Sequence, residues 1–235
     1  MNLLLLEAGQ VDDSGDAVIE GAPLAHVINV LGKGVGDTLR VGVLGGQIGR
    51  ATVTSLSTAR AQLQCTLDTD PPQPSPVRLV LALPRPPMLR RLLAAATAMG
   101  VKQIHLVQSA RVDKSYWGTP SLTDAKVGEQ LRLGLAQAVD TILPEVHIHR
   151  RFRPFIEDAV PAVAGEGARL VADLVPTARP IRAAVGPSTL AVGPEGGWVD
   201  FERERFDEAG FCAVGLGPRV LRVETAVVAL LARLG

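Results

Sequence analysis

The chain has few cysteines, few aromatic residues and no excess of either charge. Its two cysteines, Cys65 and Cys212, stand far apart and match no metal-binding or redox spacing, so we expect a reduced compartment. Basic and acidic residues balance at 24 each, which excludes attraction of a polyanion through overall charge alone. Aromatic residues make up 3%, so any stacking on nucleic-acid bases would rest on very few side chains.

Long apolar runs are also missing. The start, residues 1–7, has an apolar stretch that is too short for a signal sequence and lacks a basic flank. No stretch approaches the roughly 18 apolar residues that a membrane span needs. We therefore expect a cytoplasmic protein with no membrane association.

A proline-rich segment predicts the domain boundary. Four of the six residues in 71–76 are proline, and they can continue neither a helix nor a central strand. The sequence therefore predicts a domain over 1–70, a stiff linker over 71–76 and a second domain over 77–235. Up to Pro72, eight acidic residues outnumber four basic ones, so the remainder is net basic, with 20 against 16.

The two domains differ in pattern. Short, partly alternating segments predict β-strands over 39–44, 48–56 and 60–67, with a tight turn at Gly45-Gly46. Beyond the linker, apolar runs predict strands over 77–83, 104–107, 146–149, 170–174, 190–192 and 213–216. Between and after them, helices are predicted over 88–99, 123–143, 200–209 and 224–234, with Asp200 as an N-cap. This alternation indicates an α/β fold with a largely parallel sheet.

Two glycine-rich loops follow predicted strands, where open α/β sheets bind ligands. The first, 192–198, places three glycines around Glu195, which lets the backbone approach a ligand closely. The second, 215–226, leads through Arg219 and Arg222 into the last helix. Taken singly, the first could be an ordinary turn and the second a salt-bridged helix cap. Their occurrence about twenty residues apart, at successive strand ends, favours a binding site.

These loops resemble a known family. Gly193-Pro194-Glu195-Gly196-Gly197, followed by the segment 216–226, is similar to the C-terminal signature of the RsmE family of 16S ribosomal RNA uracil-N3 methyltransferases, in the SPOUT superfamily. Fainter similarity, as at Met99-Gly100-Val101, extends over the whole chain. The resemblance implies a PUA-like β-barrel over 1–70 that helps to bind RNA. It also implies a catalytic domain with a C-terminal trefoil knot and a homodimer.

The resemblance also implies the ligands and their sites. The cofactor is S-adenosylmethionine, the partner is 16S ribosomal RNA or the small ribosomal subunit, and no metal is involved. Candidates for the RNA side are Arg219 and Arg222, to hold phosphate or stabilise the uracil anion, and Glu224, as a general base or a helix cap. The implied cofactor residues are Asp173, Gly193, Pro194, Glu195, Gly196, Gly197, Leu216, Gly217, Leu221, Glu224 and Thr225.

Several positions depart from the family pattern on the RNA side. Charged or polar family residues are replaced at Gly32, Ala95, Ala98, Ala136 and Asp140. The cofactor signature is kept, which favours an enzyme. Two alternatives stay open: a divergent paralogue that methylates another RNA or substrate, and a non-catalytic protein that binds the ribosome or another partner.

Other polar side chains have less specific interpretations. Tyr116-Trp117 could stack on bases or belong to the core or an interface, and His105, His147 and His149 are interpreted as structural. Two arginine clusters could contact phosphate or form a solvated surface; they comprise Arg85, Arg90 and Arg91, and Arg150, Arg151 and Arg153.

Overall fold

The computed structural model describes residues 2–175, 177–181 and 186–235. It divides into two units, each with its own apolar core. The first comprises Met1–Gln73 together with Arg132–Leu143, and the second Pro74–Leu131 together with Pro144–Gly235. The first boundary therefore falls inside the proline-rich segment 71–76. The segment 132–143, which the sequence pattern assigned to the second domain, packs with the first unit.

The first unit is built on a five-stranded sheet with the order β1-β3-β4-β5-β2. Its strands are β1 (Leu4–Leu6), β2 (Asp16–Glu20), β3 (Thr38–Val43), β4 (Ile48–Leu56) and β5 (Arg60–Thr69). The three predicted strands are thus present, whereas β1, β2 and the helix α1 (Gly21–Asn29) were not predicted. Because β1 and β2 form the two edges, the described strands make a half-barrel rather than the closed barrel that the resemblance implies.

The helix α3 (Asp124–Ala138) ends five residues before its predicted end at 143. Val139 has a φ of 58°, a left-handed conformation that is strained for a β-branched residue and that interrupts the helix. The buried Asp140 then accepts a hydrogen bond from the Ile142 amide at 2.9 Å. The departure from the family pattern at Asp140 therefore has a structural role, because its carboxylate organises the turn after α3.

The second unit contains a parallel seven-stranded sheet with the order β10-β12-β9-β11-β6-β7-β8. Its strands are β6 (Val77–Ala82), β7 (Gln103–Val107), β8 (Glu145–His149), β9 (Ala168–Ala172), β10 (Arg179–Pro180), β11 (Ser188–Val192) and β12 (Cys212–Gly215). Every residue of the central strand β11 is buried. An α/β fold with a parallel sheet is therefore confirmed, and its apolar strands are covered on both faces.

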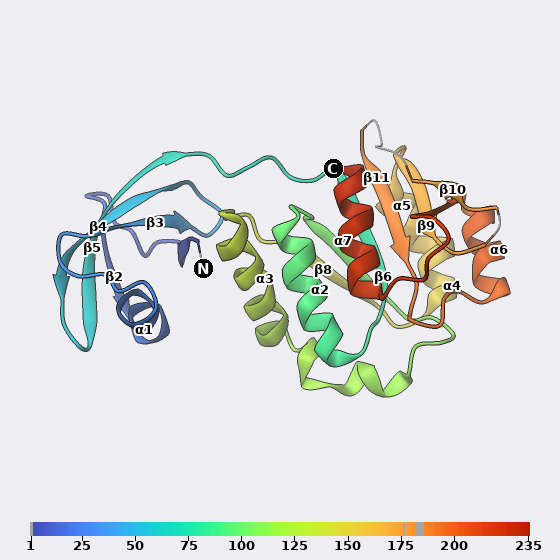
Figure 1. The fold of residues 1–235 in the computed structure, drawn as a ribbon, viewed down its shortest axis with the longest axis horizontal. Helices are drawn as coiled ribbons and strands as arrows, with labels where there is room; N and C mark the ends of the chain where they lie inside the picture. Colours follow the sequence, from blue (N-terminus) through green and yellow to red (C-terminus); the bar gives the residue numbers. More distant parts are fainter. Residues whose placement is uncertain (1, 176, 182–185) are drawn as a thin grey trace. The chain divides into compact units, whose positions relative to one another are not determined.

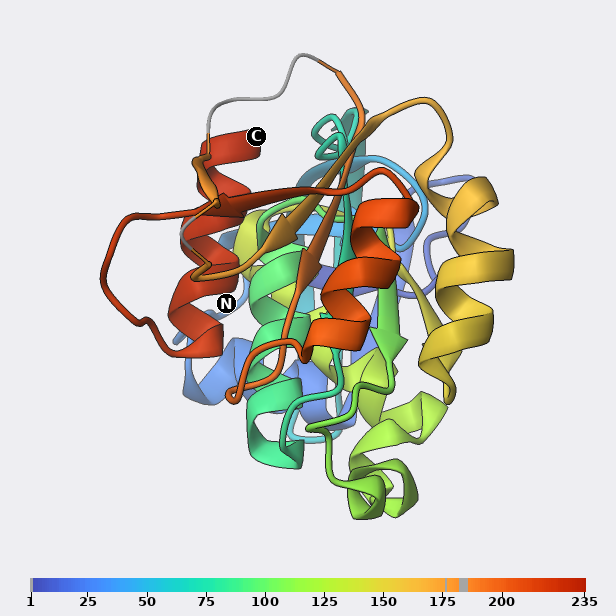
Figure 2. The same ribbon diagram turned by 90° about the vertical axis from the view of Figure 1, so that its right-hand side faces the viewer.

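Helices cover the two faces of this sheet. Figures 1 and 2 show α2 (Pro86–Ala98) and α7 (Val223–Leu234) side by side on one face. The other face is covered by α4 (Phe152–Pro154), α5 (Val160–Ala164) and α6 (Asp200–Glu208). The helical segment around α4 and α5 was not predicted. The predicted N-cap of α6 was wrong by one residue, because Val199 occupies that position and Asp200 is the first helical residue.

The described helices contain none that is both long and apolar enough to cross a membrane.

Candidate functional site

A pocket of about 270 Å³ lies at the carboxyl ends of β9, β11 and β12. The segments that follow these three neighbouring strands form its walls, together with one face of α7. Carboxyl ends of parallel strands meet at one edge of the sheet, so loops far apart in sequence come together there. A larger hollow of about 710 Å³ adjoins the pocket, and the two share Asp173, Leu174, Gly215, Leu216 and Val220.

The glycine-rich segment 193–197 forms the wall after β11. Gly197 has a φ of +72°, and its amide donates to the Pro194 carbonyl at 2.8 Å, which closes a tight turn. A Cβ on Gly193 would lie 3.1 Å from the indole of the fully buried Trp198. Backbone conformation therefore favours glycine at position 197, and close packing against Trp198 favours it at position 193.

The face of α7 toward the pocket is apolar. Val223, Ala226 and Leu230 lie three and four residues apart, on one side of the helix, and all three line the pocket. Glu224 and Thr225 lie between them and do not line it. Arg222 is the exposed N-cap residue of α7 and is also outside the lining.

The structure brings most of the predicted cofactor residues to this one pocket. Those that line it are Asp173, Gly193, Pro194, Glu195, Gly196, Gly197, Leu216 and Leu221, with the predicted RNA-side residue Arg219. Gly217, with a φ of +108°, lines the adjoining hollow instead. The predicted residues Glu224, Thr225 and Arg222 line neither the pocket nor the hollow.

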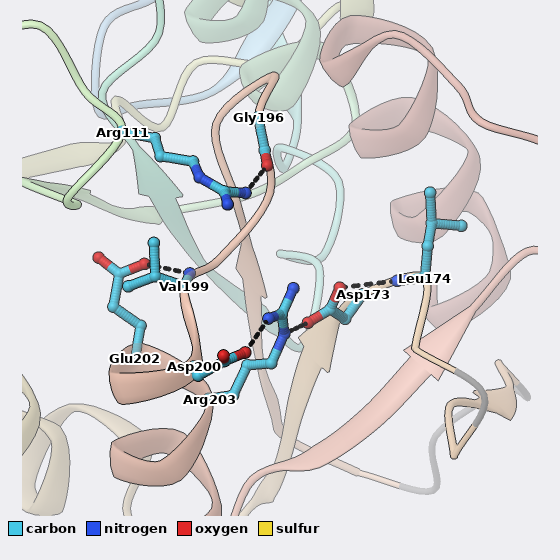
Figure 3. A network of polar contacts seen from close by, with 8 residues as sticks. All are labelled: Arg111, Asp173, Leu174, Gly196, Val199, Asp200, Glu202 and Arg203. Atoms are coloured by element: carbon cyan, nitrogen blue, oxygen red, sulfur yellow. Dashed lines mark hydrogen bonds and ion pairs between the residues drawn. The ribbon is translucent and has the colours of Figure 1, made fainter.

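The polar part of the pocket is an ion-paired network that the sequence did not predict (Figure 3). Arg203 Nε donates to Asp173 Oδ2 at 2.7 Å, and its Nη1 donates to Asp200 Oδ1 at 2.8 Å. The Asp173 side chain is only 9% exposed, and its other oxygen accepts from the Leu174 amide at 2.8 Å. The hydrogen bond to Asp173 raises the pKa of the Arg203 guanidinium, so this side chain is fully charged.

The neighbouring Glu202, on α6, forms hydrogen bonds with the backbone of two loops. This residue is buried, and its carboxylate accepts hydrogen bonds from the Ala110 amide at 2.7 Å and from the Val199 amide at 3.0 Å. Ala110 lies in the loop after β7, whereas Val199 directly follows the glycine-rich loop 192–198 (Figure 3). A single carboxylate thus fixes the spacing of two loops at the same edge of the sheet.

Two arginines hold the outer side of the glycine-rich loop. Arg111 donates to the Gly196 carbonyl (Figure 3), and Arg85 forms an exposed ion pair with Glu195 at 3.3 Å. An exposed ion pair of this kind contributes little to the stability of the folded chain, about 0–1 kcal/mol. Of the two arginine clusters, only Arg85 therefore has a described contact with the pocket loops.

The three histidines gather on one side of β7 and β8, away from the pocket. His105 Nδ1 lies 3.1 Å from His149 Nε2, and the His105 ring stacks on His147 with ring centroids 4.7 Å apart. Burial, and then the neighbouring His147, His149 and Arg78, lower the pKa of His105 to about 4. Among the described residues, no group of His, Cys, Asp and Glu could hold a metal ion.

Trp117 belongs to the apolar core. Its side chain is buried, its indole nitrogen donates to Gln108 Oε1, and the Arg150 guanidinium lies 5.6 Å from the ring centroid. Of the two interpretations left open by the sequence, the core role therefore applies to Trp117, which offers no free face to a base.

The pocket suits a ligand with an apolar part and a charged part. Its walls combine free glycine backbone, aliphatic side chains and the four charged residues Asp173, Glu195, Arg203 and Arg219. Few charged groups in an otherwise apolar cleft are typical of cofactor sites.

Comparisons with known proteins find similarity to RNA methyltransferases. The sequence model of the RNA methyltransferase domain matches residues 71–235. Ribosomal RNA small subunit methyltransferase E of Treponema pallidum is 31% identical over 238 residues, which cover 97% of this chain and 88% of the relative. The protein of that name from Synechocystis is 28% identical and covers 91% of this chain and 70% of its own length.

Solved structures give the same result. Ribosomal RNA small subunit methyltransferase E from Neisseria gonorrhoeae, bound to S-adenosyl methionine, superposes with a TM-score of 0.76 at 25% identity. The superposition covers 99% of this chain and 95% of that one. A putative methyltransferase from Legionella pneumophila, at 19% identity, shares the fold with a TM-score of 0.75 over 99% of this chain and 96% of its own.

Proposed function

Because this chain belongs to the RNA methyltransferase family, we propose that it transfers a methyl group from S-adenosylmethionine to N3 of a uridine in 16S ribosomal RNA. One observation carries the proposal. The glycine-rich segment 193–197 and the segment after β12 meet over a single pocket, in a chain whose relatives are ribosomal RNA small subunit methyltransferases.

The cofactor is proposed to lie in this pocket. The free backbone of 193–197 can approach it closely, while Leu216, Leu221 and the apolar face of α7 provide contacts for its adenosine part. When bound, the cofactor supplies a methyl group that its sulfonium has already activated. The residues of the chain then need only to hold the cofactor, orient the base and assist removal of the N3 proton.

The RNA is proposed to approach from the rim of the pocket. Arg219 is exposed at the rim, and Arg222 is exposed at the start of α7. Guanidinium groups in such positions can hold phosphate or stabilise the negative charge on uracil after N3 loses its proton. Glu224, half-buried in the first turn of α7, is the candidate base, although its position equally suits a helix-capping role. N3 is hidden in a base pair, so the target uridine must be unpaired or flipped out.

The first unit is proposed to bind the same RNA despite its acidic composition. Arg40 and Arg50 are exposed register partners on β3 and β4, and Lys33 lies with Arg40 around a small hollow. Within the described part of the chain, these three side chains have no ion pair or hydrogen bond. Unpaired cations on one face of a sheet are suited to phosphate contacts.

The finer features implied by the resemblance are part of the proposal. They are a trefoil knot in the second unit, a PUA-like relationship of the first unit, a cytoplasmic location and a homodimer. Exposed apolar side chains at the pocket, Leu174 and Val220, support a second copy of the chain as the cover of this surface. Light scattering of the purified protein tests the dimer, and a monomer at micromolar concentration would contradict it.

The test of the activity is methyl transfer from labelled cofactor to small ribosomal subunits from a strain that lacks this gene. Nucleoside analysis should find 3-methyluridine at one position. Labelling of another nucleoside, or labelling only of RNA that is not ribosomal, would refute the proposed substrate and favour a divergent paralogue. A chain that neither binds the cofactor nor labels any RNA would favour a non-catalytic binding protein.

A further inference from the structure

In the charged part of the pocket, two carboxylates hold the side chain of Arg203 in one orientation, which an apolar ligand would not need. Arg203 reaches from the first turn of α6 to the end of β9, and two carboxylates fix its guanidinium. Of these, Asp173 is nearly buried, whereas Asp200 is 93% exposed. Since a planar guanidinium held in this way has lost most of its rotamer freedom, it can accept a further partner at small entropic cost.

One nitrogen of this guanidinium is left over. Nε and Nη1 donate to Asp173 and Asp200, and Nη2 makes no hydrogen bond to the described residues. Figure 3 shows this third nitrogen turned away from both carboxylates. Because Arg203 lines the pocket and is 35% exposed, the nitrogen is accessible to a ligand.

We propose that Arg203 binds the α-carboxylate of the methionine part of S-adenosylmethionine. This inference rests on the proposed function, since it assigns a subsite within the same pocket. The carboxylate is the only anionic group of the cofactor, whose sulfonium and ammonium groups are cations. A guanidinium N–H donating to a carboxylate is among the stronger hydrogen bonds in proteins.

The other cation of the pocket is less suited to this role. Arg219 is exposed, and none of its side-chain nitrogens contacts a described residue, so ordering it on a ligand would cost rotamer entropy. Asp173, in contrast, acts through Arg203: its buried carboxylate orients the guanidinium and would itself repel a ligand carboxylate. Arg203 is therefore the ligand-binding residue of the pair, and Asp173 is the positioning residue.

The experiment measures the affinities of two ligands by calorimetry. One is S-adenosylmethionine, and the other is its decarboxylated form, which keeps the adenosine, sulfonium and ammonium groups. In Arg203→Gln, we expect the affinity for S-adenosylmethionine to fall about tenfold or more, as for a lost charge-assisted hydrogen bond. The affinity for the decarboxylated form should change less than twofold. Arg203→Lys should lose less than Arg203→Gln, because it keeps the charge.

The matched control is Arg205→Gln. Arg205 lies on the same helix, pairs with Glu208 at 2.6 Å and does not line the pocket, so neither affinity should change. Equal losses for both ligands in Arg203→Gln would mean that Arg203 only holds Asp173, and would overturn the proposal. Unchanged affinity for S-adenosylmethionine would overturn it too. If the unmodified chain binds neither ligand, the cofactor assignment itself fails, which is a separate outcome.

Discussion

Replacing Glu202 by alanine should loosen the loops that frame the pocket. The Glu202 carboxylate is 2% exposed and is the acceptor for two backbone amides, those of Ala110 and Val199. The two amides belong to segments about ninety residues apart in sequence. Glu202→Ala removes both acceptors at once, and these two amides make no other hydrogen bond to the described residues.

The size of the effect follows from those two bonds. A buried donor without a partner costs about 1–3 kcal/mol, and a hydrogen bond to a charged group contributes about 1.5–3 kcal/mol. Ala110 is exposed enough for water to replace part of the loss, whereas Val199 is half-buried. We therefore expect Glu202→Ala to lower the free energy of unfolding by about 2–3 kcal/mol. Glu202→Gln should lose about half of that, because its one amide oxygen can still serve one donor.

Urea unfolding measures this change, with Glu204→Ala as the control. Glu204 is exposed on the same helix and has no described ion pair, so its replacement should stay within about 0.5 kcal/mol. Cofactor affinity should also fall in Glu202→Ala, since Val199 directly follows the glycine-rich loop. A loss of stability below about 1 kcal/mol in Glu202→Ala would refute the assignment of both bonds to this carboxylate.

Three further predictions concern separate features. His105 has a pKa of about 4 in the folded chain and about 6.5 when unfolded. As the pH falls, His105 therefore becomes protonated in the unfolded chain before it does in the folded chain. The free energy of unfolding should fall by up to about 3 kcal/mol as the pH drops from 6.5 to 4. His105→Leu should flatten this slope in acid unfolding curves. Gly197→Val forces a β-branched residue into a φ of +72° and should weaken cofactor binding at least tenfold in calorimetry, with the fold retained in circular dichroism. Removing both Arg40 and Arg50 should weaken RNA binding and reduce the slope of log affinity against log salt by about 2.

Each of the three has an outcome that would contradict it. An acid unfolding curve that is identical with and without His105 would mean that its proton uptake is the same in both states. Gly197→Val with unchanged affinity would remove the turn from the cofactor site. An unchanged salt slope without the two arginines would exclude that face of the first unit from RNA contact.

The sequence alone predicted those features that depend on residues close together in the chain. The apolar run at 77–83 predicted a buried parallel strand, and β6 lies there with all but one of its residues buried. The segment 193–197 was predicted to be a loop after a strand, and it directly follows β11. Composition and periodicity act within a few residues, so such features are predictable.

Features that depend on distant contacts were missed. Nothing near Arg203 in sequence indicates that it pairs with Asp173, thirty residues earlier, or that Glu202 accepts from Ala110. The end of α3 was also missed, because the helical pattern continues past Val139 and only the observed left-handed φ shows the break. The spacing of Val223, Ala226 and Leu230 along α7 could have shown from the sequence that Glu224 lies off the apolar face. The prediction for Glu224 followed the family motif instead of this spacing.

The central claim, that the chain methylates one uridine of 16S ribosomal RNA, is tested most directly in cells. Small-subunit RNA from a strain without the gene is compared by mass spectrometry with RNA from the same strain carrying the gene or its Gly197→Val variant. We predict that a single 3-methyluridine disappears with the gene, returns with the unmodified gene and stays absent with the variant. An unchanged content of 3-methyluridine in all three strains would contradict the claim.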